Sequence, residues 1–223
     1  MFERNREQEK EKMTDSYCVI ADIAGEYKTF LALLNKMPKG YTLSLGDVND
    51  RGSQSKEVIE WFMKAEKDGT GESLLGNHET FIWDAYESSP YNYGSGVWQM
   101  NGGDATLKSF GGIVPKEVVG WIKTLKTEKI IKIEDKTYLI SHTFKVKWDH
   151  EEPLEPIDIV WNRRPPESYD EYDVQIAGHN SNFGLREWKF KNGKTALCID
   201  TSASRKLTGI HLPSMKIYQQ EYL

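Results

Sequence analysis

The sequence predicts an α/β fold in which two β-sheets pack face to face and helices cover their outer sides. In the first half, apolar strand-like runs alternate with amphipathic segments, a pattern typical of parallel strands joined by crossover helices. In the second half, strand-like runs predominate. The chain has 223 residues, of which 38% are hydrophobic and 28% charged, so it can bury a full core without disulfides.

Three strand–helix units make up the first half. Each begins with an apolar run that predicts a buried strand, followed by a segment whose apolar residues recur at helical spacing. The strand and helix of each unit cover 16–22 and 26–37, 41–47 and 55–69, and 71–77 and 78–89. In parallel sheets of this kind, functional groups gather at the carboxyl ends of the strands.

The composition changes at Pro90, where Gly and aromatic residues become frequent. Residues 90–112 predict an irregular cap with a short helix, and a further helix is predicted over 115–125. The strand-like runs that follow cover 129–135, 136–142, 173–179, 185–190, 194–201, 206–212 and 215–220. The pair Asn192-Gly193 between two of these runs predicts a hairpin turn.

We expect one domain over residues 14–223, with the cap 90–112 as an insert and residues 1–13 as a charged N-terminal extension. The formal net charge of −5 gives no overall basic field, so nucleic acid is not an expected partner. The start of the chain is too charged for a signal peptide, and the apolar runs are too short to span a membrane. Cys18 and Cys198 lie in apolar runs and are interpreted as buried reduced thiols. These features predict a cytoplasmic protein.

Polar residues end five of the predicted strands, and they are Asp22, Asp47, Asn77, His142 and His179. Carboxylate and amide oxygens together with imidazole nitrogens form a ligand set for divalent metals. Helix N-capping is the alternative for any single Asp or Asn in this set, since both residues cap well. Capping does not account for all five strand ends together.

The order and spelling of these motifs resemble the phosphoprotein phosphatase branch of the calcineurin-like metallophosphoesterases. The family pattern is Gly-Asp-x-His-Gly, Gly-Asp-x-x-Asp-Arg-Gly, Gly-Asn-His-Glu and two separate histidines. It corresponds here to "ADIAG", "GDVNDRG", "GNHE", "SHT" and "GHN", and "CIDTSASRKLTGIHL" is similar to the family's last strand and hairpin. The resemblance spans roughly 17–220, is closest to the compact bacterial and bacteriophage serine/threonine phosphatases, and implies a four-layer α-β-β-α sandwich.

The resemblance implies a centre of two divalent metal ions, most often Mn²⁺, with Fe, Zn, Ni, Co and Mg as alternatives. Asp47 would bridge the two ions and Asp22 would bind the first. The second ion would be bound by Asn77, His142 and His179. A hydroxide held between the metals would then attack the phosphorus atom in line.

The resemblance also implies roles around the phosphate. His78 would protonate the leaving oxygen and Asp50 would orient His78. Arg51 would bind the phosphate oxygens through its planar guanidinium. Arg163 in "VWNRRPP" would be a second phosphate clamp, with Arg164 as the alternative and a solvated loop as the structural interpretation of both.

The segment "GVWQMNGGDATLKSFGG" resembles a cap segment of bacterial relatives. Trp98 and Asn101 are candidates for contact with the substrate. Trp98 is equally well explained as a packing residue of the cap, and both interpretations remain open.

Position 24 departs from the family pattern, because Ala24 stands where the first motif has a histidine that binds the first metal. Alanine has no donor atom, so we expect a weakened first-metal site and an impaired or inactive enzyme. A natural pseudo-enzyme usually loses several catalytic residues together. The isolated, truncating change favours a deliberate substitution in an otherwise working enzyme.

The resemblance implies hydrolysis of phosphate monoesters, either phosphorylated Ser, Thr or Tyr in proteins or small phosphate esters. One alternative is a dinucleoside polyphosphate or nucleotide pyrophosphohydrolase of the same fold. The complete "DRG" of the second motif argues against it. The other alternative is a catalytically silent module that binds phosphorylated partners, and Ala24 is its support.

Overall fold

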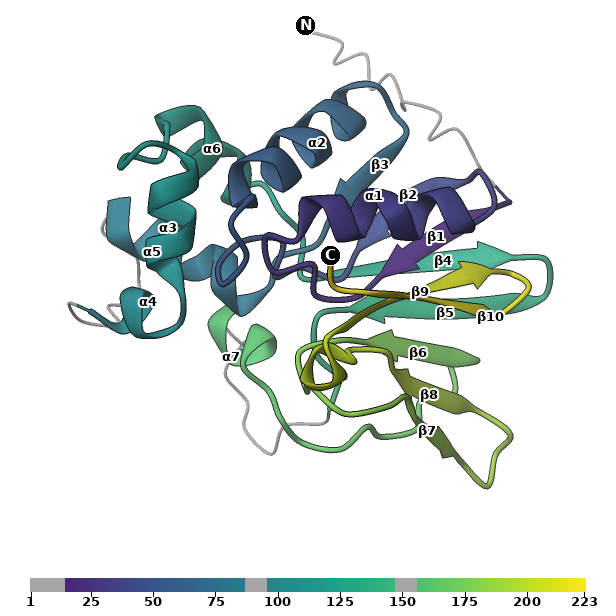
Figure 1. Cartoon of the computed structure of the whole chain (residues 1–223). Coiled ribbons are helices and arrows are strands. Elements are labelled where there is room, and N and C mark those ends of the chain that lie inside the picture. The colour runs from purple at the N-terminus through teal and green to yellow at the C-terminus, as the bar shows by residue number, and fades with distance from the viewer. Residues whose placement is uncertain (1–14, 87–95, 147–155) are drawn as a thin grey trace, which may run out of the picture.

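Two mixed sheets of five strands each lie face to face in the computed structural model, which describes residues 15–86, 96–146 and 156–223 (Figure 1). Helices flank the two sheets, as the sequence predicts. The predicted extension 1–13 and the start of the predicted cap, 90–95, lie outside the described residues. Among the described residues, no helix has the length and apolarity that crossing a membrane requires.

The first sheet has the strand order β10-β9-β1-β2-β3. Its strands are β1 (Tyr17–Ile20), β2 (Tyr41–Ser44), β3 (Gly71–Ser73), β9 (Lys206–Leu212) and β10 (Lys216–Glu221). The strands β1, β2 and β3 are parallel, whereas β9 pairs antiparallel with β1 and with β10. The crossover helices α1 (Tyr27–Lys36) and α2 (Ser55–Lys67) lie on the outer face of this sheet (Figure 1).

The second sheet has the strand order β4-β5-β6-β8-β7. Its strands are β4 (Glu128–Ile133), β5 (Lys136–Ser141), β6 (Val174–Ala177), β7 (Arg186–Lys189) and β8 (Thr195–Cys198). The central strands β5, β6 and β8 are parallel, and both edge strands are antiparallel. Gly193 has a φ of 80° in the turn between β7 and β8, so the predicted hairpin is confirmed.

The strands of the first half end earlier than the sequence predicts. The second one stops at Ser44 instead of continuing to Asp47. Gly46 and Asp47 have φ angles of 96° and 52°, and left-handed residues cannot continue a strand. The polar residues predicted at the strand ends therefore lie beyond the strands, Asp22 and Asp47 in the following loops and Asn77 at the first position of α3.

The helices of the cap and the second half differ from the prediction in detail. The cap contains two short helices, α4 (Val97–Met100) and α5 (Gly103–Ser109), where one was expected. The helix α6 (Lys116–Ile122) follows, and α3 (Asn77–Tyr86) begins one residue earlier than predicted. The helix α7 (Pro156–Val160) and a 3₁₀ turn at Ser202–Ser204 are too short to show helical periodicity and were not predicted.

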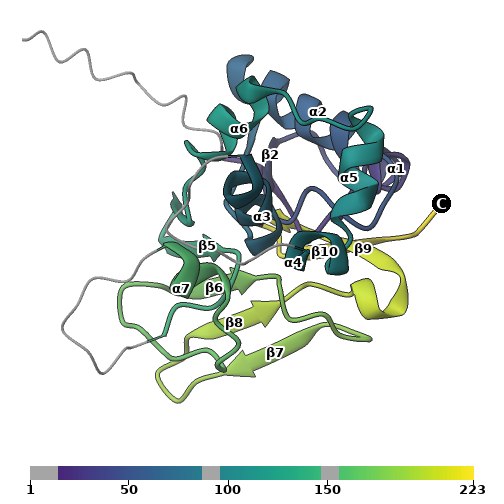
Figure 2. The ribbon, with the colours of Figure 1, turned by 90° about the vertical axis from the view of Figure 1, so that its left-hand side faces the viewer.

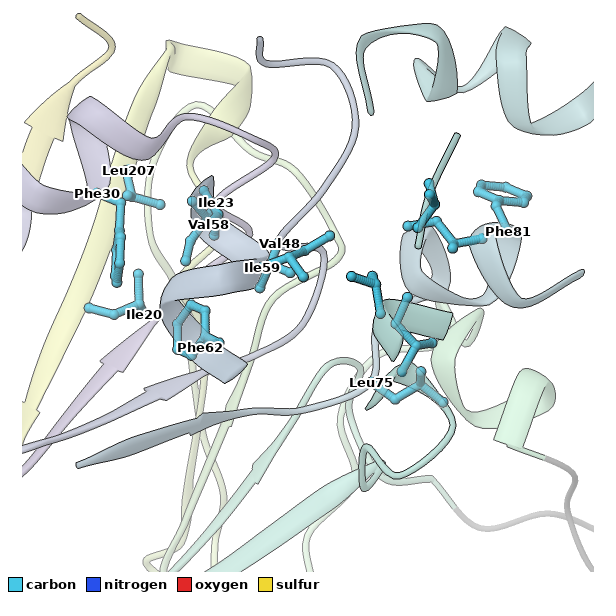
Figure 3. Close-up of a cluster of buried hydrophobic side chains, with 14 of the residues drawn as sticks. Ile20, Ile23, Phe30, Val48, Val58, Ile59, Phe62, Leu75, Phe81 and Leu207 are labelled. Atoms are coloured by element: carbon cyan, nitrogen blue, oxygen red, sulfur yellow. The ribbon is translucent and has the colours of Figure 1, made fainter. Parts of the chain in front are cut away.

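The core between the sheets is made of apolar side chains from both of them. Its fully buried members are Val19, Leu43, Leu45, Tyr138, Ile140, Ile176, Ile199, Ile210 and Leu212. A second cluster lies between the first sheet and its helices, where Ile20 lies beside Phe30 of α1 and Phe62 of α2 (Figure 3). The rings of Phe30 and Phe62 are 5.5 Å apart.

This second cluster also anchors the loops that follow β1, β2 and β3. Each loop contributes one buried apolar side chain, namely Ile23, Val48 and Leu75 (Figure 3). Burying each side chain contributes about 1.5–3 kcal/mol, which fixes the polar neighbours of these residues at the sheet edge.

Glu79 holds two of these loops against α3. Its side chain is fully buried, and Oε2 accepts hydrogen bonds from the backbone N–H groups of Asp47 and Gly76 at 2.9 and 2.7 Å. Oε1 accepts a third from Val48 at 2.7 Å. One buried carboxylate therefore aligns the loop after β2 with the loop after β3.

We expect Glu79→Gln to lower the free energy of unfolding by about 1–3 kcal/mol, because the amide nitrogen would face a backbone N–H that needs an acceptor. Urea denaturation measures this difference. The matched variant Glu57→Gln, on the exposed first turn of α2, should change it by less than about 0.5 kcal/mol. Equal effects of the two substitutions would contradict the role of Glu79.

Candidate active site

The five polar residues predicted as metal ligands all follow parallel strands of the two sheets. Asp22, Asp47 and Asn77 come after β1, β2 and β3, and His142 and His179 come after β5 and β6. The parallel strands end on the side of the molecule where α3, α4 and α7 lie (Figures 1 and 2). All five residues are buried.

Four of these residues converge on one point. Nε2 of His142 lies 3.0 Å from Oδ1 of Asn77, 3.1 Å from Nδ1 of His179 and 3.5 Å from Oδ1 of Asp47. The ligand atoms of Asp47, His142 and His179 all lie within 4.8 Å of one another. This spacing suits a single divalent metal ion bound by oxygen and nitrogen.

The two histidines are prepared as neutral ligands. Nδ1 of His142 lies 2.9 Å from the carbonyl oxygen of Leu45 and donates its proton there, which leaves a lone pair on Nε2. Burial lowers the pKa of His142. Burial and the neighbouring His142 lower the pKa of His179 to about 3. Nε2 of His179 is buried and has no hydrogen-bond partner among the described residues.

Three carboxylates, those of Asp22, Asp47 and Asp200, are buried close together at the site. Burial, Asp200 and Asp47 raise the pKa of Asp22 well above its usual value. Burial also raises the pKa of Asp200. For Asp47 burial acts in the same direction, but the histidines around it outweigh burial and hold the pKa at about 2. Such a concentration of buried acids is costly without a cation, so the residues present fit a divalent metal.

Two glycines allow these carboxylates to lie against the backbone. A Cβ atom on Gly76 would be 2.2 Å from Oδ1 of Asp47, and one on Gly178 would be 2.2 Å from Oδ1 of Asp22. The backbone N–H of His179 donates to both oxygens of Asp22, at 3.1 and 3.2 Å. Any larger residue at either glycine would displace a predicted ligand.

The backbone at the site is held in an uncommon conformation. Five non-glycine residues there have φ angles of 49–68°, namely Ala24, Asp47, Asp50, Arg51 and His179. Ala24 is fixed because its N–H donates to Asp47 O and its carbonyl accepts from Gly52 N, both at 2.8 Å. The loop that lacks the histidine of the family pattern is therefore bonded to the loop that carries Asp47.

His78 lies between Asp50 on one side and Arg51 and Asp47 on the other. Its Nδ1 lies 2.6 Å from Oδ2 of the fully buried Asp50. Its Nε2 lies 3.1 Å from Nη2 of Arg51 and 3.8 Å from Oδ2 of Asp47. Burial lowers the pKa of His78, but Asp47 and Asp50 outweigh burial, so the pKa is raised. Arg51 is itself exposed.

The structure places the cap residues Trp98 and Asn101 in different surroundings. Trp98 is buried, and its Nε1 donates to Oδ1 and Oδ2 of Asp50 at 3.0 and 3.2 Å. Asn101 is partly buried and donates from Nδ2 to the carbonyl of Val97 at 2.8 Å. Contact of either residue with a substrate stays a prediction.

Of the two arginines in "NRRPP", Arg163 is the one beside the metal ligands. Its Nη1 lies 3.4 Å from Oδ1 of Asn180, the residue after His179. Its positive charge contributes to the lowered pKa of His179. Arg164 donates its backbone N–H to Asn162 at 3.0 Å. Both arginine side chains are exposed, and the role of Arg163 as a phosphate clamp stays a prediction.

Three residues near the site were not assigned from the sequence. Asp200 follows β8 by two residues, the same distance that separates Asp22 from β1 and His179 from β6. The strand-end rule therefore applies to Asp200 as well and could have found it. The other two are Glu79 and Tyr222. The hydroxyl of Tyr222 is buried and has no hydrogen-bond partner in the part of the chain that the structure describes. Burial, followed by the charges of Asp200 and Asp22, raises its pKa.

Known proteins resemble this chain in sequence and in fold. Residues 16–199 match the family model described as calcineurin-like phosphoesterase. Serine/threonine-protein phosphatase 2 of Salmonella typhimurium is 29% identical over an alignment of 163 residues that covers 65% of this chain and 66% of that protein. The match thus spans slightly less than two thirds of that relative.

Two solved structures show the same architecture. A putative diadenosine tetraphosphatase superimposes with a TM-score of 0.60 and 17% identity, covering 93% of this chain and 94% of its own. A protein serine/threonine phosphatase from Saccharomyces cerevisiae gives a TM-score of 0.60 and 15% identity, covering 93% and 80%. The family model covers most of the chain. The chain belongs to the calcineurin-like phosphoesterase family.

Proposed function

We propose that this chain is a metal-dependent phosphatase for phosphate monoesters, either phosphorylated Ser, Thr or Tyr in proteins or small phosphate esters. The observation that carries the proposal is the position of His78. One ring nitrogen is held by Asp50 at 2.6 Å, and the other lies between Arg51 and the metal ligand Asp47. A general acid next to a phosphate-binding arginine is what cleavage of a phosphate ester requires.

The chain's own residues have two roles, phosphate binding and proton donation. Arg51 and Arg163 are exposed at the site and bind the phosphate oxygens through their guanidinium groups. His78 donates the proton on Nε2 to the leaving oxygen. Asp50 keeps the proton on Nδ1 in place, so that only Nε2 faces the substrate.

Asp47, Asn77, His142 and His179 would hold one divalent ion, and Asp22 together with Asp47 would hold the other. Bound divalent metals lower the pKa of water and draw charge from phosphate oxygens. We propose Mn²⁺ as the metal, with Fe, Zn, Ni, Co and Mg as alternatives. The position held by Asp22 and Asp47 lacks a ligand at Ala24, and we propose that this gap weakens the enzyme.

We expect Mn²⁺ at a hundredfold excess over its Kd to raise the free energy of unfolding by about 2.7 kcal/mol, because the folded chain alone presents the buried ligands. Thermal unfolding with Mn²⁺ and with a chelator measures the shift. His179→Ala should remove most of it, whereas His211→Ala on β9 should retain it. No stabilisation by any of the six candidate metals would contradict metal binding.

We expect Ala24→His to raise Mn²⁺-dependent hydrolysis of an aryl phosphate at least about tenfold, because it restores a donor atom to the first metal. Histidine tolerates the left-handed backbone at this position, where φ is 49°. Metal content per chain should rise in parallel. An unchanged rate together with unchanged metal occupancy would show that Ala24 is not the missing ligand position.

A substrate panel on the Ala24→His protein distinguishes the possible functions. The panel contains a phosphopeptide, an aryl phosphate, a cyclic nucleotide and a dinucleoside polyphosphate. We expect turnover of the phosphopeptide or the aryl phosphate in preference to the others. Preferred cleavage of the dinucleoside polyphosphate would identify a nucleotide pyrophosphohydrolase instead. Turnover of none, with phosphopeptide binding retained, would indicate a silent phosphate-binding module.

A further inference from the structure

The carboxylate of Asp50 is bound by the cap as well as by His78. Thr106 of α5 donates its hydroxyl to Oδ1 at 2.6 Å, and Trp98 of α4 donates Nε1–H to the same oxygen at 3.0 Å. Oδ2 receives Nδ1–H of His78 at 2.6 Å. Asp50, Trp98, Thr106 and His78 are all buried, with exposed fractions of 0–6%.

These contacts fix the carboxylate of Asp50 beside His78. Thr106 contacts Oδ1 alone and Trp98 lies closer to Oδ1 than to Oδ2, at 3.0 against 3.2 Å, so Oδ2 has fewer cap contacts and is the oxygen presented to the imidazole. The hydroxyl of Thr106 also accepts the backbone N–H of Asp50 at 2.9 Å, at a residue whose φ is 68°. Thr106 therefore fixes both the backbone and the side chain of Asp50.

The cap fits closely against this part of the site. The carbonyl of Gly102 accepts the backbone N–H of Arg51 at 3.2 Å, and a Cβ on Gly102 would be 2.8 Å from that nitrogen. A Cβ on Gly103 would be 2.5 Å from the Trp98 indole. The two glycines let the cap backbone approach both the phosphate-binding arginine and the indole that holds Asp50.

We propose that Trp98 and Thr106 are positioning residues that orient His78 through Asp50, so that the cap takes part in proton delivery to the leaving group. The inference rests on the proposed phosphatase function. It gives Trp98 a role in catalysis without contact to the substrate. Its consequence is that loss of either donor should matter most for leaving groups that need a proton.

The first test compares an ester with a poor leaving group, phenyl phosphate, with a good one, 4-nitrophenyl phosphate. Trp98→Phe and Thr106→Val should lower kcat on phenyl phosphate by about 10- to 100-fold, part of what a general acid contributes. The loss on 4-nitrophenyl phosphate should be below about threefold, and KM should stay unchanged. Thr106→Ser, which keeps the hydroxyl, should recover the activity on phenyl phosphate.

The matched controls are Trp121→Phe and Thr124→Val. Trp121 donates Nε1–H to Glu66 at 2.7 Å, and Thr124 donates to the carbonyl of Trp121 at 2.7 Å, both at the exposed end of α6. These controls should leave both rates unchanged. Equal losses on the two esters after Trp98→Phe and Thr106→Val, or a rise in KM alone, would overturn the proposal.

A second measurement does not depend on turnover. The proton between His78 Nδ1 and Asp50 should give a downfield ¹H NMR signal that is protected from exchange and absent in His78→Gln. The signal should shift or exchange faster in Trp98→Phe and Thr106→Val, and it should persist in Trp121→Phe. An unchanged signal in both cap variants would overturn the positioning role. If the NMR signal behaves as expected in all the variants but the unsubstituted protein hydrolyses neither ester, the result would count against the phosphatase function and not against the positioning role.

Discussion

The carboxylate of Asp47 is the group on which the rest of the site depends. It lies 3.5 Å from Nε2 of His142, accepts the backbone N–H of His78 at 2.9 Å and lies against the Cα of Gly76. Its backbone is held in a left-handed conformation by Glu79. The loop after β2, the helix α3 and a histidine from the second sheet therefore meet at one buried charge, which a divalent cation would neutralise.

Two parts of the molecule surround this charge, the loops of the two sheets and the cap. The loops of the two sheets collect oxygen and nitrogen ligands, and their apolar neighbours Ile23, Val48 and Leu75 anchor the loops in the core. The cap reaches the same site from the other side through Asp50. The carboxylate of Asp50 is shared by the cap and His78, so we propose that a change in the cap alters the orientation of His78 without touching a predicted metal ligand.

The sequence alone predicted most of the fold, because helices and strands are amphipathic at their own periods and the strand ends carry polar residues. It was less accurate where the signal is local and short. The strands were predicted too long, since positive φ angles at Gly46 and Asp47 are not encoded in hydrophobicity. Helix α7 has five residues, fewer than two turns, so no period could reveal it.

The sequence by itself determined the family, the ligand candidates and the departure at Ala24, because each of these is written in the identity of residues at fixed spacing. The tertiary structure decided which of these residues lie in contact with one another. It showed the close group of Asp47, His142 and His179, placed Asp200 beside Asp22, and turned Trp98 toward Asp50. Such contacts join residues 37 or more positions apart, so only the packing of the two sheets and the cap defines them.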